Sequence, residues 1–266
     1  MTPLIQKAVA VAIDLRIEVD SLISTMRPAL VSPERLQCAL FLTIAEQFES
    51  VVRLAKADLI SHGAILVRSM LEATADLRLL GTEQDHVDRM KYSRAAGEKR
   101  FYEQLLTIQQ LSESVRQFVG ARQPALAGHY ARLHERFRKS KRTQVEAFVA
   151  AGMADVVGYY VILCSFAHND ITALGLRHQG ETSMTYKAAI PDAVAFLIIQ
   201  LATTALLWAT EEMRGPAQFA DGEFERRTLA MNVAYQRLLA LRPIGEGESA
   251  DEESRPKAAL DDSIMP

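Results

Sequence analysis

Two apolar stretches of the sequence each carry side chains that could take part in catalysis. In the first, ILVRSMLEATADLRLL, Arg68 and Glu72 stand four residues apart among aliphatic side chains. In the second, VVGYYVILCSFAHND, Ser165 and His168 share one face of the expected helix. A histidine can act as a general acid or base, and an arginine beside it can stabilise a developing oxyanion or phosphorane. If the two stretches meet, these four side chains would suit metal-independent RNA cleavage.

Four more polar side chains flank this quartet, and we expect them to bind a ligand there: Ser69, Tyr160, Asn169 and Asp170. The expected ligand carries phosphate, as a nucleotide or an RNA does. Asn169 and Asp170 also have an ordinary structural interpretation, because asparagine and aspartate commonly stand at the ends and starts of helices.

The charges at Arg68 and Glu72 have a purely structural interpretation as well. Burying an ion is costly unless it is paired, and a spacing of four residues lets the two side chains pair on one helix. A histidine on an apolar face is also more often a hydrogen-bonded core residue than a catalyst. The second hypothesis is therefore a non-catalytic interaction or structural module, in which the polar cluster only fixes how the helices pack. A ligand site must open to solvent, whereas a packing cluster can be closed.

The R-S-x-x-E motif from Arg68 to Glu72, followed by the S-x-x-H motif from Ser165 to His168, resembles an uncharacterised bacterial family, a domain of unknown function. The resemblance covers roughly residues 35–180. It implies that the Arg, Ser and Glu of the first motif and the Ser and His of the second recur within the family. It implies no activity, but it favours one shared polar site over two unrelated ones.

A looser similarity exists to the helical ribonuclease and nucleotide-binding superfamily of bacterial defence and toxin systems, which uses an Arg and a His separated by four to six residues. This sequence departs from that pattern, because Arg68 and His168 are far apart in the chain. The formal match, RQPALAGH from Arg122 to His129, contains a proline and a glycine that predict a loop. We interpret that match as chance.

The basic run RLHERFRKSKR is a candidate nucleic-acid patch. Its cations are Arg132, Arg136, Arg138, Lys139, Lys141 and Arg142. Such side chains would contact phosphates, and binding would then fall steeply as salt rises. The ordinary interpretation is a solvated helix face, and a third is a contact with the acidic C-terminal tail.

The overall composition excludes several classes of protein. The formal net charge is -3 and the pI is about 6.1, so the chain lacks the global basic field of general nucleic-acid binders. The sequence has no P-loop, dinucleotide fingerprint, nucleophile elbow or His-Glu-x-x-His motif, and we expect neither a cofactor nor a metal. Cys38 and Cys164 fit buried thiols, and no signal peptide is recognisable, so we expect an intracellular, cytoplasmic protein.

Helical patterns dominate, and the sequence predicts an all-α bundle of eight or nine helices in a single domain over residues 1–242. Residues 193–209 indicate a central buried helix rather than a membrane span, because polar side chains interrupt an apolar run of marginal length. Residues 243–266 are acidic and poor in large apolar side chains, which predicts disorder. A second copy of the chain or another protein is a further expected partner, and a membrane is not.

Turn and capping residues predict the element boundaries. A first helix is expected over residues 3–26, and a second is expected to have Ser32 as its N-cap. We expect a turn at residues 61–63, a break at residues 120–128, and a loop over residues 177–187.

Overall fold

The computed structural model describes residues 1–168, 170–178, 183–187 and 189–241. Within these residues the chain forms ten α-helices and one antiparallel pair of two-residue strands, β1 (Arg27–Pro28) and β2 (Ala217–Gln218). The all-α class is confirmed, and the expected number of eight or nine helices was too low.

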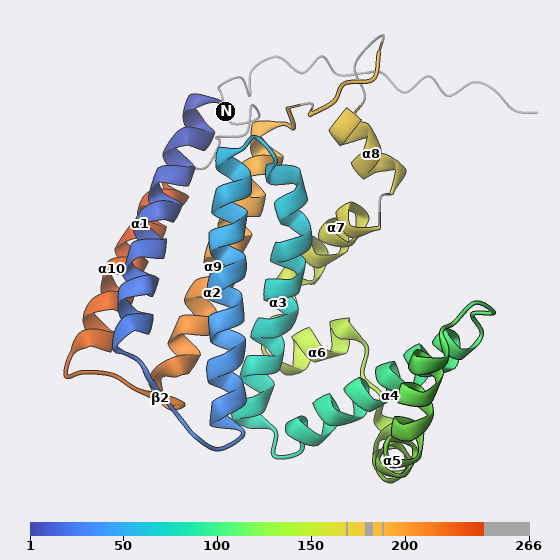
Figure 1. The fold of residues 1–266 in the computed structure, drawn as a ribbon. Coiled ribbons are helices and arrows are strands. Elements are labelled where there is room, and N and C mark those ends of the chain that lie inside the picture. The colour runs from blue at the N-terminus through green and yellow to red at the C-terminus, as the bar shows by residue number, and fades with distance from the viewer. Residues whose placement is uncertain (169, 179–182, 188, 242–266) are drawn as a thin grey trace, which may run out of the picture.

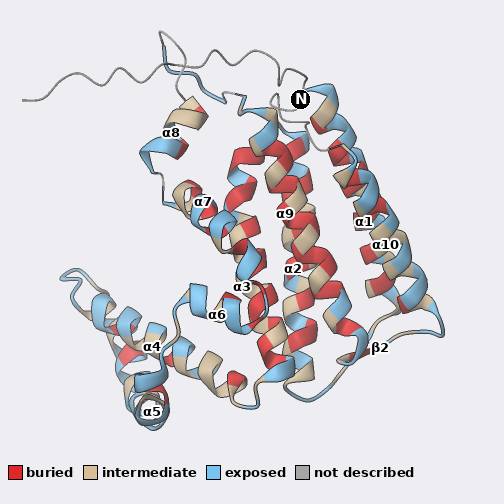
Figure 2. Ribbon diagram, turned by 180° about the vertical axis from the view of Figure 1, so that it is seen from behind, coloured by how far each residue is buried: buried red, intermediate tan, exposed pale blue. Residues whose placement is uncertain are grey.

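Five long helices form the main bundle (Figure 1): α1 (Pro3–Thr25), α2 (Glu34–Lys56), α3 (Ile60–Thr82), α9 (Asp192–Glu211) and α10 (Glu223–Leu239). Central among them is α9, which contacts the other four. The side chains of α9 itself are apolar on all sides, so every face of this helix can be buried. Figure 2 shows buried residues along its length. Its buried Thr203 and Thr210 donate to carbonyls four residues earlier, which satisfies their hydroxyl groups.

The segment Asp192–Arg214 is the one helix of the described chain that is long and apolar enough to cross a membrane, with a mean hydropathy of 1.9. In the structure, 67% of this apolar window is buried inside the bundle. The core helix of a soluble protein has the same properties, so the segment is weak evidence for a span. The structure shows the central buried helix that the sequence predicts.

The connection between α2 and α3 differs from the expected one. The prediction of a turn at residues 61–63 was wrong, because α3 already begins at Ile60. The chain reverses over residues 57–59 instead, where Asp58 has a φ of 57°. Gly63 lies inside α3, where a Cβ would come within 3.5 Å of Val51 on α2. That is an ordinary van der Waals contact, so the packing of the two helices would also accept an alanine at this position. The expected cap at Ser32 was also wrong, since α2 begins at Glu34 with no side-chain cap.

Two further helices, α4 (His86–Leu106) and α5 (Glu113–Phe137), pack against each other and project beside the bundle (Figure 1). We call residues 86–142 the arm. The expected break at residues 120–128 was wrong, because α5 runs through Pro124. This proline removes the hydrogen bond to the carbonyl of Gly120, but both residues are exposed and water can replace the bond. The stretch from Arg122 to His129 is therefore helical rather than a loop.

Three short helices follow the arm: α6 (Gln144–Ala150), α7 (Val157–Ala167) and α8 (Ile171–His178). The side chains of Thr143 and Glu146 form a capping box that starts α6. The side chain of Asp170 accepts a hydrogen bond from the backbone of Thr172 at the start of α8. These two caps explain the undercount of helices, because helices of seven or eight residues depend on caps and packing and show little periodicity. The loop expected over residues 177–187 was wrong at its start, because Arg177 and His178 belong to α8.

The predicted disorder of residues 243–266 concerns a segment that lies outside the described residues. The predicted single domain over residues 1–242 stays a prediction.

Candidate functional site

A polar cluster joins α3 to α7. The hydroxyl of Tyr160 donates to Oε1 of Glu72 over 2.7 Å, and Nε of Arg68 donates to the same carboxylate oxygen over 3.1 Å. Nε of Arg68 also lies 3.3 Å from the Tyr160 hydroxyl, and the guanidinium carbon is 5.4 Å from the centre of the ring. We call Arg68, Glu72 and Tyr160 the α3–α7 cluster.

The environment fixes the protonation of this cluster. Burial, and then the hydrogen bond to Glu72, raises the pKa of Tyr160 to about 12. The hydrogen bond with Tyr160, and then the charge of Glu72, raises the pKa of Arg68. Near neutral pH the phenol therefore keeps its proton and the guanidinium its charge, and neither can act as a base.

The cluster is only partly open to solvent. The side chains of Arg68 and Glu72 are 26% and 35% exposed, whereas Tyr160 is 8% exposed. Arg68 and Tyr160 both direct hydrogen bonds to Oε1 of Glu72, so this carboxylate has partners without a ligand. This arrangement is typical of side chains that fix the packing of two helices.

The other predicted site residues have different surroundings. Ser69 accepts a hydrogen bond from the amide of Gln47 over 2.9 Å. Ser165 is half-buried, and its position five residues beyond Tyr160 places it on the opposite side of α7. His168 is exposed and ends α7, where its backbone N–H donates to the carbonyl of Cys164.

Among the hydrogen bonds and ion pairs of the described residues, none joins the side chains of Ser165 or His168 to the α3–α7 cluster. Their catalytic role stays a prediction. Asp170 caps α8, in agreement with its structural interpretation, and Asn169 lies outside the described residues.

The basic run divides into paired and unpaired cations. Arg136 donates to Asp88 over 2.8 Å, and Arg142 forms two hydrogen bonds, of 3.1 and 2.9 Å, with the carboxylate of Glu83. These two arginines hold the end of α5 to α4 and to the end of α3. The other four cations are exposed, and no acidic side chain of the described chain pairs with them: Arg132, Arg138, Lys139 and Lys141.

The excess of positive charge is not confined to this run but extends over the whole arm. The arm carries thirteen Lys and Arg against five Asp and Glu, a formal charge of +8. Residues 1–85 and 143–241 together carry fourteen basic and twenty-one acidic side chains, a formal charge of -7. The arm is therefore a basic body attached to an acidic bundle. This division was not predicted from the sequence, although counting charges over residues 86–142 would have found it.

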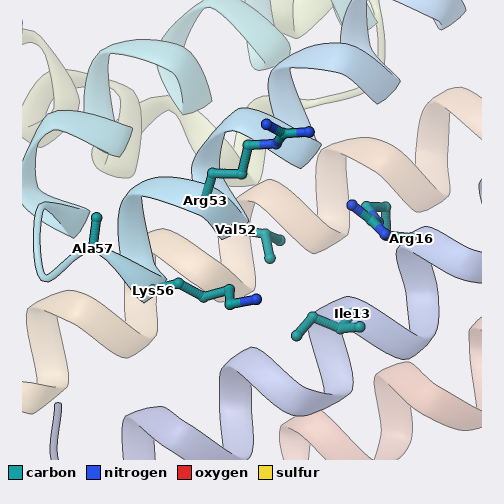
Figure 3. A pocket seen from close by; sticks show the side chains of 6 residues that line it. All are labelled: Ile13, Arg16, Val52, Arg53, Lys56 and Ala57. Atoms are coloured by element: carbon teal, nitrogen blue, oxygen red, sulfur yellow. The ribbon is translucent and has the colours of Figure 1, made fainter.

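A shallow hollow of about 470 Å³ lies between α1 and α2 (Figure 3). Three cations line it, Arg16, Arg53 and Lys56, above an apolar floor that includes Val52. Both arginines already donate to Oε1 of Glu49, over 3.0 and 2.6 Å, and they lower the pKa of that carboxyl. Of the three cations, Lys56 alone has no ion pair with the described residues, so the hollow offers an anion one unpaired cation.

In the described part of the chain, no three His, Cys, Asp or Glu side chains gather as metal ligands.

Comparison with family models places these features in one segment. A model described as "Family of unknown function (DUF5677)" matches residues 34–185. The chain belongs to this family. The expected membership of a family of unknown function is thereby confirmed. The matched segment of this DUF5677 member runs from α2 to α8, so it contains the α3–α7 cluster and the whole arm. No curated protein and no solved structure matches the chain.

Proposed function

We propose that this protein binds single-stranded RNA through the arm, and that the α3–α7 cluster is a packing device rather than a catalytic centre. One observation carries the proposal: the arm has a formal charge of +8 while the rest of residues 1–241 has -7. A polyanion is attracted to the arm and repelled by the bundle, which orients it on approach.

Many of the arm's cations are available for phosphate contacts. Seven of the thirteen form no ion pair with the described acidic side chains: Arg100, Arg116, Arg122, Arg132, Arg138, Lys139 and Lys141. They occur on α4, on α5 and on the segment that follows α5, so they extend over the length of the arm. Contacts of this kind depend on phosphate and not on base sequence.

Two exposed aromatic side chains favour an unpaired strand over a duplex. Phe101 on α4 is 56% exposed and Phe118 on α5 is 52% exposed, and each lies within two turns of the connection at the tip of the arm. The guanidinium of Arg122 lies 4.6 Å from the centre of the Phe118 ring. Exposed rings beside cations are the stacking platforms that single-stranded nucleic-acid binders use for unpaired bases.

The location of the protein is part of the same proposal. Cys38 is buried and Cys164 is half-buried, and neither forms a disulfide with the other. Free thiols and an RNA ligand both fit the cytoplasm.

The first test measures binding of a short fluorescent single-stranded RNA by anisotropy, between about 50 and about 200 mM salt. The arm variant replaces its four unpaired cations by serine: Arg132, Arg138, Lys139 and Lys141. We expect its Kd to rise at least tenfold at the lower salt concentration. The slope of log Kd against log salt should fall by about 0.7 for each phosphate that the variant no longer neutralises.

A charge-matched variant is the control. It replaces four exposed bundle cations that form no ion pair with described residues, namely Lys7, Arg27, Arg35 and Lys56, by serine. Both variants lose four positive charges, so net charge alone predicts equal weakening. We expect the control to bind within twofold of wild type. Equal weakening in the two variants, or an unaffected arm variant, would reject the arm as the RNA site.

Replacing Phe101 and Phe118 by alanine tests the choice of a single strand. Loss of stacking should weaken the binding of single-stranded RNA by about 1–3 kcal/mol per base. The slope of log Kd against log salt should stay unchanged. Binding to duplex DNA of equal length should not change. If the binding of both nucleic acids weakens equally, the two rings support the fold of the arm and do not stack on bases.

A further inference from the structure

The outer face of α7 is apolar but uncovered. One side of α7 packs against α3 with Tyr160, Leu163 and Phe166 buried. On the other side Val161 is 58% exposed and Ile162 is 50% exposed. A helix that is apolar all round is normally buried all round. The outer half of α7 therefore lacks the cover that its composition calls for.

The neighbouring helix α8, which packs against α7, carries two more exposed apolar side chains. We call the exposed parts of five side chains the α7–α8 face: Tyr159, Val161, Ile162, Ile171 and Leu174. Their exposed areas sum to roughly 500 Å² over the two helices, and exposed apolar surface of that size on a monomer is often functional. These five side chains are uncharged, and the exposed Asp170, next to Ile171, lies at their border.

We propose that the α7–α8 face binds the same face of a second copy of this chain, with two-fold symmetry. In such an interface each patch meets its own image, so any charge on it would face a like charge. This face meets that requirement because its members are uncharged. The arm does not, since its charge of +8 would repel a second arm.

Another exposed apolar patch, on α1 and α10 of the bundle, is less suitable. Ile17, Leu229 and Val233 lie in a hollow between α1 and α10, but charged residues border them. Those charges already bridge α1 and α10 within one molecule, as in the ion pair between Arg237 and Asp14 at 3.0 Å. A second copy would have to desolvate these pairs.

The residues along the outside of α7 allow two such helices to approach closely. Gly158, Val161, Ile162 and Ser165 follow one another at helical spacing, with a small residue one turn before and one turn after the branched pair. A Cβ added at Gly158 would meet nothing within 4 Å, so this glycine faces open space. Crossing at Val161 and Ile162 would place the small residues where the partner's backbone comes nearest.

The size of the face sets the expected strength. Two copies would bury roughly 1,000 Å² in total, which is the lower limit for a specific protein interface. We therefore expect a reversible dimer with a Kd in the micromolar range. This inference does not depend on RNA binding by the arm.

The test is sedimentation velocity of the full chain from low micromolar to several hundred micromolar concentration. Wild type should shift from monomer to dimer over this range. Val161→Glu should raise the dimer Kd at least tenfold, because it places two carboxylates against each other. Val233→Glu is the matched control, since Val233 is 55% exposed on α10, and it should dimerise as wild type does.

A second pair of variants tests the interface with substitutions that should not disturb the fold. Gly158→Gln should prevent close approach of the helices, whereas Gly97→Gln in α4 should not, and a Cβ meets nothing within 4 Å at either position. Both gain helix propensity, so both should fold. The proposal is overturned if wild type stays monomeric throughout, if Val161→Glu and Gly158→Gln dimerise normally, or if Val233→Glu alone dissociates the dimer.

Discussion

At the scale of single residues, Tyr160 shows how far the sequence could predict the site. It was expected beside Arg68 and Glu72, and the structure brings the three together. Ser165 was expected there too, but it lies on the other side of α7. The rotation of α7 about its axis could not be predicted, because Val161 and Ile162 outside are as apolar as Leu163 and Phe166 inside. Only packing against α3 decides which face turns inward.

Replacing Tyr160 by phenylalanine tests the α3–α7 cluster. The change removes two hydrogen bonds and leaves Glu72 paired with Arg68, so the free energy of unfolding should fall by about 1–2 kcal/mol near neutral pH. The folded-state pKa of about 12 exceeds the ordinary value of 10. Tyr160 therefore contributes full stability below pH 10, and this contribution is lost as the pH rises toward 12.

Urea unfolding at several pH values above and below 10 measures this effect. The Tyr160→Phe protein should lose less stability than wild type as the pH rises. Tyr186→Phe is the control, because Tyr186 is 85% exposed, and it should follow wild type. Parallel pH profiles for wild type and Tyr160→Phe would show that the hydrogen bonds of the cluster contribute nothing to stability.

At the scale of elements, long apolar helices were predicted well and the exposed ones poorly. The buried faces of α1, α2 and α9 constrain their periodicity, and these helices lie near their predicted positions. In α5 only Val119 and Phe137 are buried, so the pattern is weak and Pro124 dominated the prediction. A proline in an exposed helix costs stability but does not have to end the helix.

Replacing Pro124 by alanine tests whether this stretch is helical. In a helix the change restores one hydrogen bond and should stabilise α5 by up to about 3 kcal/mol, partly offset by greater freedom in the unfolded chain. Amide hydrogen exchange over residues 116–128 should slow. Gly128→Ala should act in the same direction by about 1 kcal/mol, since Gly128 also faces open space in α5. Unchanged or faster exchange in both variants would favour the loop that the sequence suggested.

At the scale of the whole molecule, a net charge of -3 conceals two bodies of opposite sign. Residues 132–142 were recognised as basic, and a count over residues 86–142 would have shown the wider excess, but the hairpin of α4 and α5 is what gathers these charges into one body. That hairpin brings together charges that are up to about fifty residues apart in the chain, such as Lys91 and Lys141. A hairpin of two helices is a tertiary feature, and helical periodicity alone does not predict it.

The acidic segment 243–266 adds a third charged part, whose effect can be measured by deleting it. It carries seven acidic and two basic side chains, so the chain that ends at residue 242 has a formal charge of +2. Because the segment offers few large apolar groups, its loss should change the Tm by no more than about 2 °C. The affinity for single-stranded RNA should rise at low salt, and the gain should disappear at high salt, where the charges are screened.

Replacing the seven acidic residues of this segment by Gln or Asn, and Arg255 and Lys257 by Gln, at constant chain length gives the same formal charge of +2 and separates charge from length. This variant should reproduce the gain in affinity of the truncated chain, because both remove the same acidic groups from the molecule. A fall in Tm of many degrees on truncation would show that the segment packs against the folded protein. A gain in affinity that persisted at high salt would show that the segment covers the arm directly, since long-range repulsion is screened under those conditions.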